Sequence, residues 1–580
     1  MAGNSYESMS QRINELQLNI PKMTRLERQV FDFFAEFFPQ SLYTMGLEEY
    51  ADKFTAYSEL NVQRALKKVA SLKKKCTSKD IVVRKLLDST EANLLWDEPG
   101  PAVGVIVDVL ASQIIKDGIR PEILKRLIPQ LTESVDDSLQ RFSGKKYSTP
   151  IMILAQYMVF SANEVLDLLV RESKDADLVV ASQRLKAKVA EFSERFAVAG
   201  FTDGEFSEVV EIMKKHGADL GREKFYRIAL NRGFDYRESP SDLESEALRW
   251  ISEDLPKLKA ATKKLSDALG CRNDPESVNN KLKEKPGVGA SQALSATLKI
   301  RPIVQALVAE SVVGINPKYQ AEVIETPSYL TAIIPSAAAQ GFDGLTVKPS
   351  QRYYLTTDPK RAPPAGFADL VNTLVHEEYG HCVHFSNTAV GYSAKPTIGE
   401  LLPSLHSGTT SEGLAFQREL EFLELLEKIA KKKESDYTVA EREYVRLCEE
   451  FGGFNQTLLE LEYNTYKQRI IRFLRVIGDS RINSGKQNLL KFLAWAEKRT
   501  GLSQRTVFYQ IFPAHEGVFP GYATCYAVVG QDIRRIQKKI KSDPEKMVAF
   551  NAYASSMGYP ARSIYTKRLR RFAESLARRK

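Results

Sequence analysis

The chain has 580 residues, of which 43% are hydrophobic and 27% charged, and this balance excludes a disordered or fibrous protein. Its 82 basic and 73 acidic residues give a net charge of +9, an excess too thinly spread to indicate a nucleic-acid partner. The five cysteines are odd in number and contain no CxxC pair, which argues against a disulfide framework and a cysteine-rich zinc module.

The sequence indicates neither a secretory signal nor a membrane span. Residues 1–17 are polar, and the most apolar stretch, residues 103–115, is too short to cross a bilayer and contains Asp108. We therefore expect a cytoplasmic protein without a membrane partner. Self-association into a homo-oligomer stays open.

Helical periodicity dominates the chain. Apolar residues recur three or four positions apart in residues 26–38, 178–196, 243–269, 414–429 and 489–496. Strand-like alternation is scarce, and residues 352–357 (RYYLTT) are the best candidate. The pattern predicts an all-α fold with minor β structure.

We divide the chain, without a sharp boundary, into an N-terminal helical part, residues 1–240, and a second part, residues 241–580, that carries the candidate site described below, within one continuous body. Residues 273–290 are rich in Pro, Gly, Asn and charge, so we expect a loop or hinge there. The predicted strand at residues 352–357 could pair with an extended peptide by edge addition.

The most informative segment is residues 368–385, ADLVNTLVHEEYGHCVHF. An apolar helical stripe leads directly into His376, Glu377, Glu378 and His381, and three of the six histidines of the chain fall in the nine residues 376–384. A helix can present two histidines to a zinc ion, with an adjacent glutamate as the base. The segment therefore predicts a zinc site.

The spacing of the histidines differs from that of the common HExxH motif. His376 and His381 are five residues apart, about 140° around an ideal helix. A π-helical distortion would bring positions i and i+5 onto one face, and Gly380 would ease it. We rank this distorted pair first. Glu377, His381 and His384, which share a face on an undistorted helix, form the competing set.

A third ligand is expected from residues 409–420, TTSEGLAFQREL. Thr409, Thr410 and Ser411 are candidate N-caps of a helix that carries Glu412 and Glu419 on one face. Glu412 would complete the ligand set and leave a fourth position for water.

In these two segments the chain resembles a domain-of-unknown-function family of helical zinc metallopeptidases with an HE…PGHH motif followed by EGWALYxE. The matching residues are His376-Glu377, Gly380-His381, Glu412-Gly413, Ala415 and Glu419. Further matches occur at residues 219–226 (DLGREKFY), 325–327 (ETP), 475–483 (RVIGDSRIN) and 520–526 (PGYATCY). The chain departs from the pattern by lacking the Pro, and by Leu414, Gln417 and Asn483 in place of Trp, Tyr and His.

The family is similar to gluzincins such as thimet oligopeptidase and thermostable carboxypeptidase. This implies a helical body around a deep cleft. It also places Tyr526 where gluzincin relatives have a donor to the developing oxyanion, with His515 as the second choice for that role. Asp479 is a candidate to orient a ligand histidine, and Arg472 and Arg475 are candidates to meet a peptide carboxylate.

Together these features predict a zinc-dependent metallopeptidase, a carboxypeptidase or oligopeptidase acting on short unfolded peptides. His376, His381 and Glu412 would bind zinc, and Glu377 would take a proton from the attacking water. Two alternatives stay open: a hydrolase of non-peptide amides or esters, and an inactive peptide-binding homologue. No GxSxG, P-loop or GxGxxG segment supports a serine hydrolase or a nucleotide enzyme.

Overall fold

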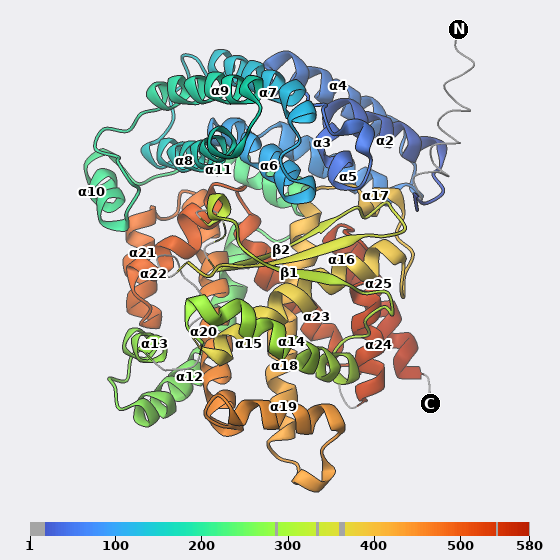
Figure 1. The fold of residues 1–580 in the computed structure, drawn as a ribbon, viewed down its shortest axis with the longest axis vertical. Helices are drawn as coiled ribbons and strands as arrows, with labels where there is room; N and C mark the ends of the chain where they lie inside the picture. The colour runs from blue at the N-terminus through green and yellow to red at the C-terminus, as the bar shows by residue number, and fades with distance from the viewer. Residues whose placement is uncertain are drawn as a thin grey trace.

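A computed structural model describes residues 18–284, 288–331, 334, 336–358, 366–540 and 543–578. Within these residues the chain is mainly helical and contains one three-stranded sheet, which confirms the predicted fold class. Figure 1 shows the N-terminal helices as a layer across the top of the molecule, with the sheet below them and the C-terminal helices filling the rest.

The N-terminal layer consists of amphipathic helices joined by short turns. Its helices are α2 (Arg25–Phe37), α3 (Pro39–Thr44), α4 (Glu59–Lys75), α5 (Ile81–Leu94), α6 (Gly100–Asp117), α7 (Pro121–Arg141), α8 (Thr149–Glu172), α9 (Ala176–Arg195), α10 (Phe206–His216) and α11 (Glu223–Ile228). The first of these shows why they form: Thr24 and Glu27 make a reciprocal capping box, and the apolar residues after it recur at helical spacing on the buried face.

The C-terminal half is built around α20, which is buried along most of its length and packs against α12, α15 and α18. Its helices are α12 (Pro240–Leu269), α13 (Pro275–Glu284), α14 (Ala293–Ser311), α15 (Phe367–Leu374), α16 (Val383–Val390), α17 (Ile398–Leu401), α18 (Leu405–Ile429), α19 (Val439–Glu449), α20 (Phe454–Asn483), α21 (Leu489–Thr500), α22 (Gln504–Ile511), α23 (Cys525–Gln537), α24 (Pro544–Ala554) and α25 (Arg562–Arg578).

Short helical segments with other hydrogen-bond patterns connect these elements. The 3₁₀ segments are η1 (Glu48–Tyr50), η3 (Ala290–Gln292), η4 (Ser328–Leu330), η6 (Glu434–Asp436) and η8 (Tyr522–Thr524). The π-helical segments are η2 (Ala229–Gly233), η5 (Val375–Cys382) and η7 (Phe512–Glu516). Both η5 and η7 carry residues that the sequence singled out, and π-helical turns are common at functional sites.

The sheet has the order β1-β3-β2. The central strand β3 (Ser350–Leu355) runs parallel to β1 (Ala321–Glu325) and antiparallel to β2 (Ala337–Phe342). The strand predicted near residues 352–357 is therefore present, but edge addition to it was a wrong prediction because β3 is paired on both sides. Among the described strands, β1 and β2 each have a free edge, and β2 packs against η5.

The loop predicted at residues 273–290 is wrong in part, because α13 occupies Pro275–Glu284. The Asp274 carboxylate accepts a hydrogen bond from the Ser277 N–H at 2.8 Å, which caps the start of the helix. Asp and Pro are common in loops, but they are also the residues that begin a helix. Residues 285–287 of the predicted loop lie outside the described residues.

The two predicted parts share one buried core. The largest cluster of buried side chains contains residues from both sides of the boundary at residue 240, for example Trp96 and Phe519, whose ring centroids are 4.8 Å apart. The division into residues 1–240 and 241–580 stays a prediction.

Within the described chain, α8 is the helix that is long and apolar enough to span a membrane, with a mean hydropathy of 1.4 over its best window. Of that window, 56% is buried, and α8 packs against α6 and α9. We interpret α8 as a core helix of the N-terminal layer.

Candidate metal centre

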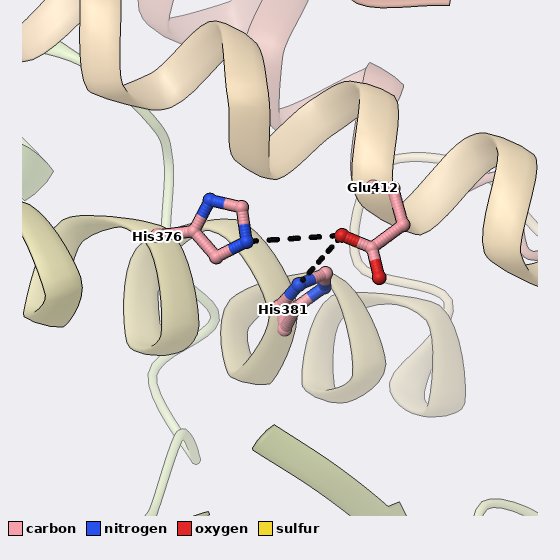
Figure 2. Close-up of side chains that lie close together, drawn as sticks. All are labelled: His376, His381 and Glu412. Atoms are coloured by element: carbon pink, nitrogen blue, oxygen red, sulfur yellow. Dashed lines mark ion pairs between the residues drawn. The ribbon is translucent and has the colours of Figure 1, made fainter. Parts of the chain in front are cut away.

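The two histidines of the motif lie on the π-helical segment η5, which continues α15 and leads into α16. The distortion that the five-residue spacing predicts is thus present between His376 and His381. Their ring centroids are 5.0 Å apart. Figure 2 shows both imidazoles directed toward Glu412, which comes from the neighbouring helix α18.

Glycines allow the helices that carry the ligands to approach closely. A Cβ added at Gly380 would lie 2.5 Å from both Cα and Cβ of Ala415 on α18. A Cβ at Gly413, beside Glu412, would lie 2.6 Å from Val529 of α23. Gly380 therefore sets the distance between η5 and α18. This role is separate from the one expected from the sequence, which was to ease the π-helical turn.

Three candidate ligand atoms converge at the site. The Glu412 Oε2 atom lies 3.7 Å from His376 Nε2 and 3.4 Å from His381 Nε2, as the dashed lines in Figure 2 mark. All three atoms are within 4.8 Å of one another. Glu412 Oε2 is buried and has no hydrogen-bond partner within the described structure. A buried carboxylate oxygen without a hydrogen-bond partner is costly, and a cation held between this oxygen and the two imidazoles would offset that cost.

The remaining polar atoms of the three side chains are held by other groups. His376 Nδ1 lies 2.6 Å from Glu419 Oε1, and His381 Nδ1 lies 2.7 Å from the Ser411 hydroxyl. The Tyr522 hydroxyl donates to Glu412 Oε1 at 2.9 Å. Each contact fixes the orientation of a side chain and leaves its other atom directed into the site, as partners of metal ligands do.

Sequence reasoning missed the roles of Ser411 and Tyr522. Ser411 was expected to cap a helix, but α18 begins at Leu405 with Ser404 as its N-cap, so Ser411 lies inside the helix. Its position next to Glu412 was the available signal. Tyr522 lies one turn before Tyr526, and the sequence gives no sign that its hydroxyl reaches α18.

The charges around the site stabilise one another. Burial opposes a positive charge on His376, but the carboxylates of Glu412 and Glu419 raise its pKa to about 9. Burial likewise opposes ionisation of Glu412, and the nearby histidines hold its pKa well below the ordinary value. The Arg472 guanidinium binds both oxygens of Glu419, at 2.7 and 3.1 Å, and helps to hold the pKa of that carboxyl low.

The residues present fit a zinc ion. Two nitrogens and one carboxylate oxygen are a usual donor set for a zinc site that keeps one open position. Ligands about 2.1 Å from a tetrahedral ion lie about 3.4 Å from one another, close to the spacings of Glu412 Oε2 from the two imidazoles.

The competing ligand set is not assembled. His384 is fully buried and its Nε2 atom faces the Gly558 carbonyl at 3.1 Å. Glu378 is also turned away from the site, because its carboxylate binds Arg301 at 2.7 Å and the Tyr319 hydroxyl at 2.9 Å. Among the residues that the structure describes, only His376, His381 and Glu412 meet the spacing of a metal site.

A cavity of about 620 Å³ opens onto these ligands. Glu377, Tyr522 and Tyr526 line it together with the free-edge strand β2. Thr44 and Met45 of the N-terminal layer also contribute to its wall. The cavity is therefore formed jointly by the two halves of the chain.

Tyr526, the predicted oxyanion donor, faces this cavity. Its hydroxyl lies 3.4 Å from His515 Nε2, and the Arg475 guanidinium carbon lies 4.6 Å from its ring centroid. Burial and the nearby Glu412 raise the pKa of Tyr526, so the hydroxyl keeps its proton. Burial and Arg475 lower the pKa of His515 well below its ordinary value, which keeps that imidazole neutral.

Two expected roles were wrong. Arg472 and Arg475 are engaged by Glu419 and Gln510, respectively, and neither is in the described lining of the cavity. Asp479 does not contact a ligand histidine, because its carboxylate accepts hydrogen bonds from Tyr226 and from the Gly521 N–H.

Comparison with known proteins places the fold but assigns no activity. No protein-family model and no curated protein matches the sequence. Solved structures that share the fold include a "putative lipoprotein of unknown function" from Shewanella oneidensis and a "putative lipoprotein" from Colwellia psychrerythraea. The match to the first has a TM-score of 0.61 at 16% identity and covers 94% of this chain and 98% of the Shewanella chain. The match to the second has a TM-score of 0.59 at 13% identity and covers 95% of this chain and 99% of the Colwellia chain.

These neighbours contradict the predicted cytoplasmic location, because both are described as lipoproteins. The prediction relied on a polar N-terminal segment and on cysteines without a pairing pattern. Neither feature determines the compartment of a protein with this fold, and we do not keep the prediction.

Proposed function

We propose that the chain is a zinc-dependent peptidase that hydrolyses short unfolded peptides. One observation carries the proposal: the Nε2 atoms of His376 and His381 and the unpartnered Oε2 atom of Glu412 converge at the wall of a cavity. Zinc bound there would supply Lewis acidity to water and to the carbonyl that is attacked. The resemblance to gluzincin-like peptidases supports the same assignment.

Glu377 is the proposed general base. It directly follows the proposed ligand His376 and lines the cavity, and, unlike Glu378, it forms no ion pair with another residue that the structure describes. Burial raises the pKa of Glu377 above its ordinary value, although the two neighbouring histidines oppose the shift. A carboxylate with a raised pKa takes a proton from water and returns it to the leaving amine more readily. Tyr526 keeps its proton and can donate to the developing oxyanion.

The free edge of β2 favours a peptide over a small ester or amide. Ala337, Ala338, Ala339 and Gly341 line the cavity, and none of them carries more than a methyl group. An extended peptide can pair with the backbone of such an edge as an added strand. The limited volume and the contribution of the N-terminal layer to the wall restrict the substrate to short, unfolded segments.

The test combines metal content with product mapping. The purified protein is expected to hold one zinc ion per chain and to cleave a mixed pool of short peptides, and a chelator should abolish cleavage. Zinc-dependent hydrolysis of ester or amide substrates without peptide cleavage would favour a non-peptide hydrolase. Stoichiometric zinc with no hydrolysis, or peptide binding without zinc, would identify a non-catalytic homologue.

A further inference from the structure

Three segments that the sequence analysis singled out, residues 219–226, 475–483 and 520–526, meet in one buried hydrogen-bond network. At its centre, Asp479 Oδ2 accepts from the Tyr226 hydroxyl at 2.5 Å. Its Oδ1 atom accepts from the Gly521 N–H at 2.8 Å and from Asn483 Nδ2 at 3.1 Å. Asp479 is 1% exposed, so its carboxylate depends on these protein contacts for its hydrogen bonds.

The network holds a strained turn. Gly521 has φ +97°, and a Cβ at this position would lie 2.9 Å from the ring of Phe234. Glycine is therefore required, and a glycine has no side chain of its own to fix the turn. The backbone N–H of Gly521 is fixed instead by Asp479, while its carbonyl accepts from the Thr524 hydroxyl at 2.6 Å.

The turn at Gly521 places the next residue, Tyr522, whose hydroxyl holds Glu412 Oε1 at 2.9 Å. Because Oε1 is occupied, the carboxylate presents Oε2 to the two histidines. A continuous chain of contacts thus leads from Asp479 through the Gly521–Tyr522 backbone to the carboxylate of the metal centre.

The other side of the network is anchored by Arg222 of the N-terminal layer. Its guanidinium donates to Glu98 at 2.5 Å, to the Glu516 carboxylate at 2.8 Å and to the Glu516 carbonyl at 3.0 Å. Asn483 joins the two halves of the network by donating to Glu516 at 3.0 Å and to Asp479. The segment that carries His515, Tyr522 and Tyr526 is therefore held at Glu516 and again at Gly521.

We infer that Asp479 is a positioning residue of the metal centre, which fixes Gly521 and thereby aligns Tyr522 with the ligand Glu412. The inference rests on the proposed metal site. It predicts that Asp479 controls zinc affinity although it lies outside the ligand set, because partners that orient a ligand typically change metal affinity by about 10–100-fold when removed.

The test is a double-mutant cycle on zinc affinity, measured by competition between the metal-free protein and a chromophoric chelator. Asp479→Ala and Tyr522→Phe are each expected to weaken zinc binding about 10–100-fold. The double variant should bind zinc no more weakly than the weaker single variant, since both changes act through one contact with Glu412. Asp479→Asn should stay within about threefold of wild type, because its amide oxygen can still accept from Gly521.

A matched control is Asp254→Asn, which changes another buried carboxylate, paired with Arg469 of α20 at 2.7 Å. This variant is expected to lower stability and leave zinc affinity unchanged. If Asp479→Ala does not fold, Tyr226→Phe takes its place in the comparison with wild type, and this variant is also expected to weaken zinc binding.

Wild-type zinc affinity in Asp479→Ala, additive losses of zinc affinity in the double variant, or an equal loss in Asp254→Asn would overturn the inference. If Tyr226→Phe replaces Asp479→Ala, wild-type zinc affinity in Tyr226→Phe would overturn it as well. If the wild type itself binds no zinc, the proposed metal centre fails and the inference with it.

Discussion

Gly380→Ala tests whether the spacing of η5 and α18 builds the metal centre. The new Cβ would lie 2.5 Å from Cα and Cβ of Ala415, whereas ordinary contacts begin at 3.4 Å. The helices must therefore separate by roughly 1 Å, and no flexible side chain can absorb the shift. Such overpacking costs about 1–3 kcal/mol, which equals or exceeds the roughly 1 kcal/mol that alanine usually gains over glycine in a helix.

The same separation should disturb the ligands. Glu412 lies three residues before Ala415, and His381 directly follows Gly380. Metal sites tolerate ligand displacements of only about 0.2 Å, so a shift of roughly 1 Å is expected to weaken zinc binding at least about tenfold. Zinc affinity by chelator competition and the urea midpoint of the metal-free protein measure the two effects separately.

The matched control is Gly104→Ala in α6, where the added Cβ meets the flexible Met158 side chain at 3.3 Å. This variant should retain the wild-type zinc affinity and urea midpoint or become slightly more stable. The reasoning is refuted if Gly380→Ala binds zinc as tightly as wild type and unfolds at the same urea concentration as the Gly104→Ala control.

Three further predictions concern the ligands, the base and the acid stability. His381→Ala should remain folded but lose the zinc ion that we propose for each chain, and equal zinc by elemental analysis in variant and wild type would contradict the site. Glu377→Gln should retain zinc and lose roughly 10²–10⁴-fold in peptide cleavage, while Glu378→Gln, which breaks an ion pair with Arg301, should lose stability but retain cleavage at matched zinc content. Burial opposes ionisation of Asp254, but Arg469 and Lys257 keep the pKa of its carboxyl below the ordinary value. The ionised carboxylate therefore stabilises the fold above about pH 3.9, and this stability is lost as the pH falls through the folded-state pKa. Asp254→Asn should therefore lose less stability than wild type on acidification in thermal unfolding scans, and an equal loss would show that the pair does not act in this way.

Local patterns predicted the helical fold and the distortion at the histidines. The five-residue spacing of His376 and His381 indicated a π-helical turn because a regular helix could not bring both rings to one face. The sheet was less accessible. The aromatic β3 could be recognised, whereas Ala337–Phe342 contains mostly alanine and glycine and becomes a strand only by pairing with β3.

The partners of the site residues could not be predicted in the same way. Tyr522 reaches Glu412 across 110 positions of sequence, and Glu419 reaches His376 across 43. Such contacts depend on how the helices pack, which a periodic pattern does not specify. The start of α18 was also misplaced, since Thr409, Thr410 and Ser411 favour a cap locally but occupy buried positions within the helix.

The histidines of η5 are one residue farther apart than in HExxH, and this spacing affects whether a sequence pattern can detect the site. Each residue turns an α-helix by about 100°, so one inserted residue rotates everything after it by that angle relative to what comes before. α15 and α16 can therefore bury unrelated faces while the imidazoles of His376 and His381 still meet. A linear pattern written for histidines four apart passes over this chain, and an alignment must open a gap inside the motif. Sites of this kind would then share the arrangement of their side chains in space, which no single residue spacing in the sequence describes.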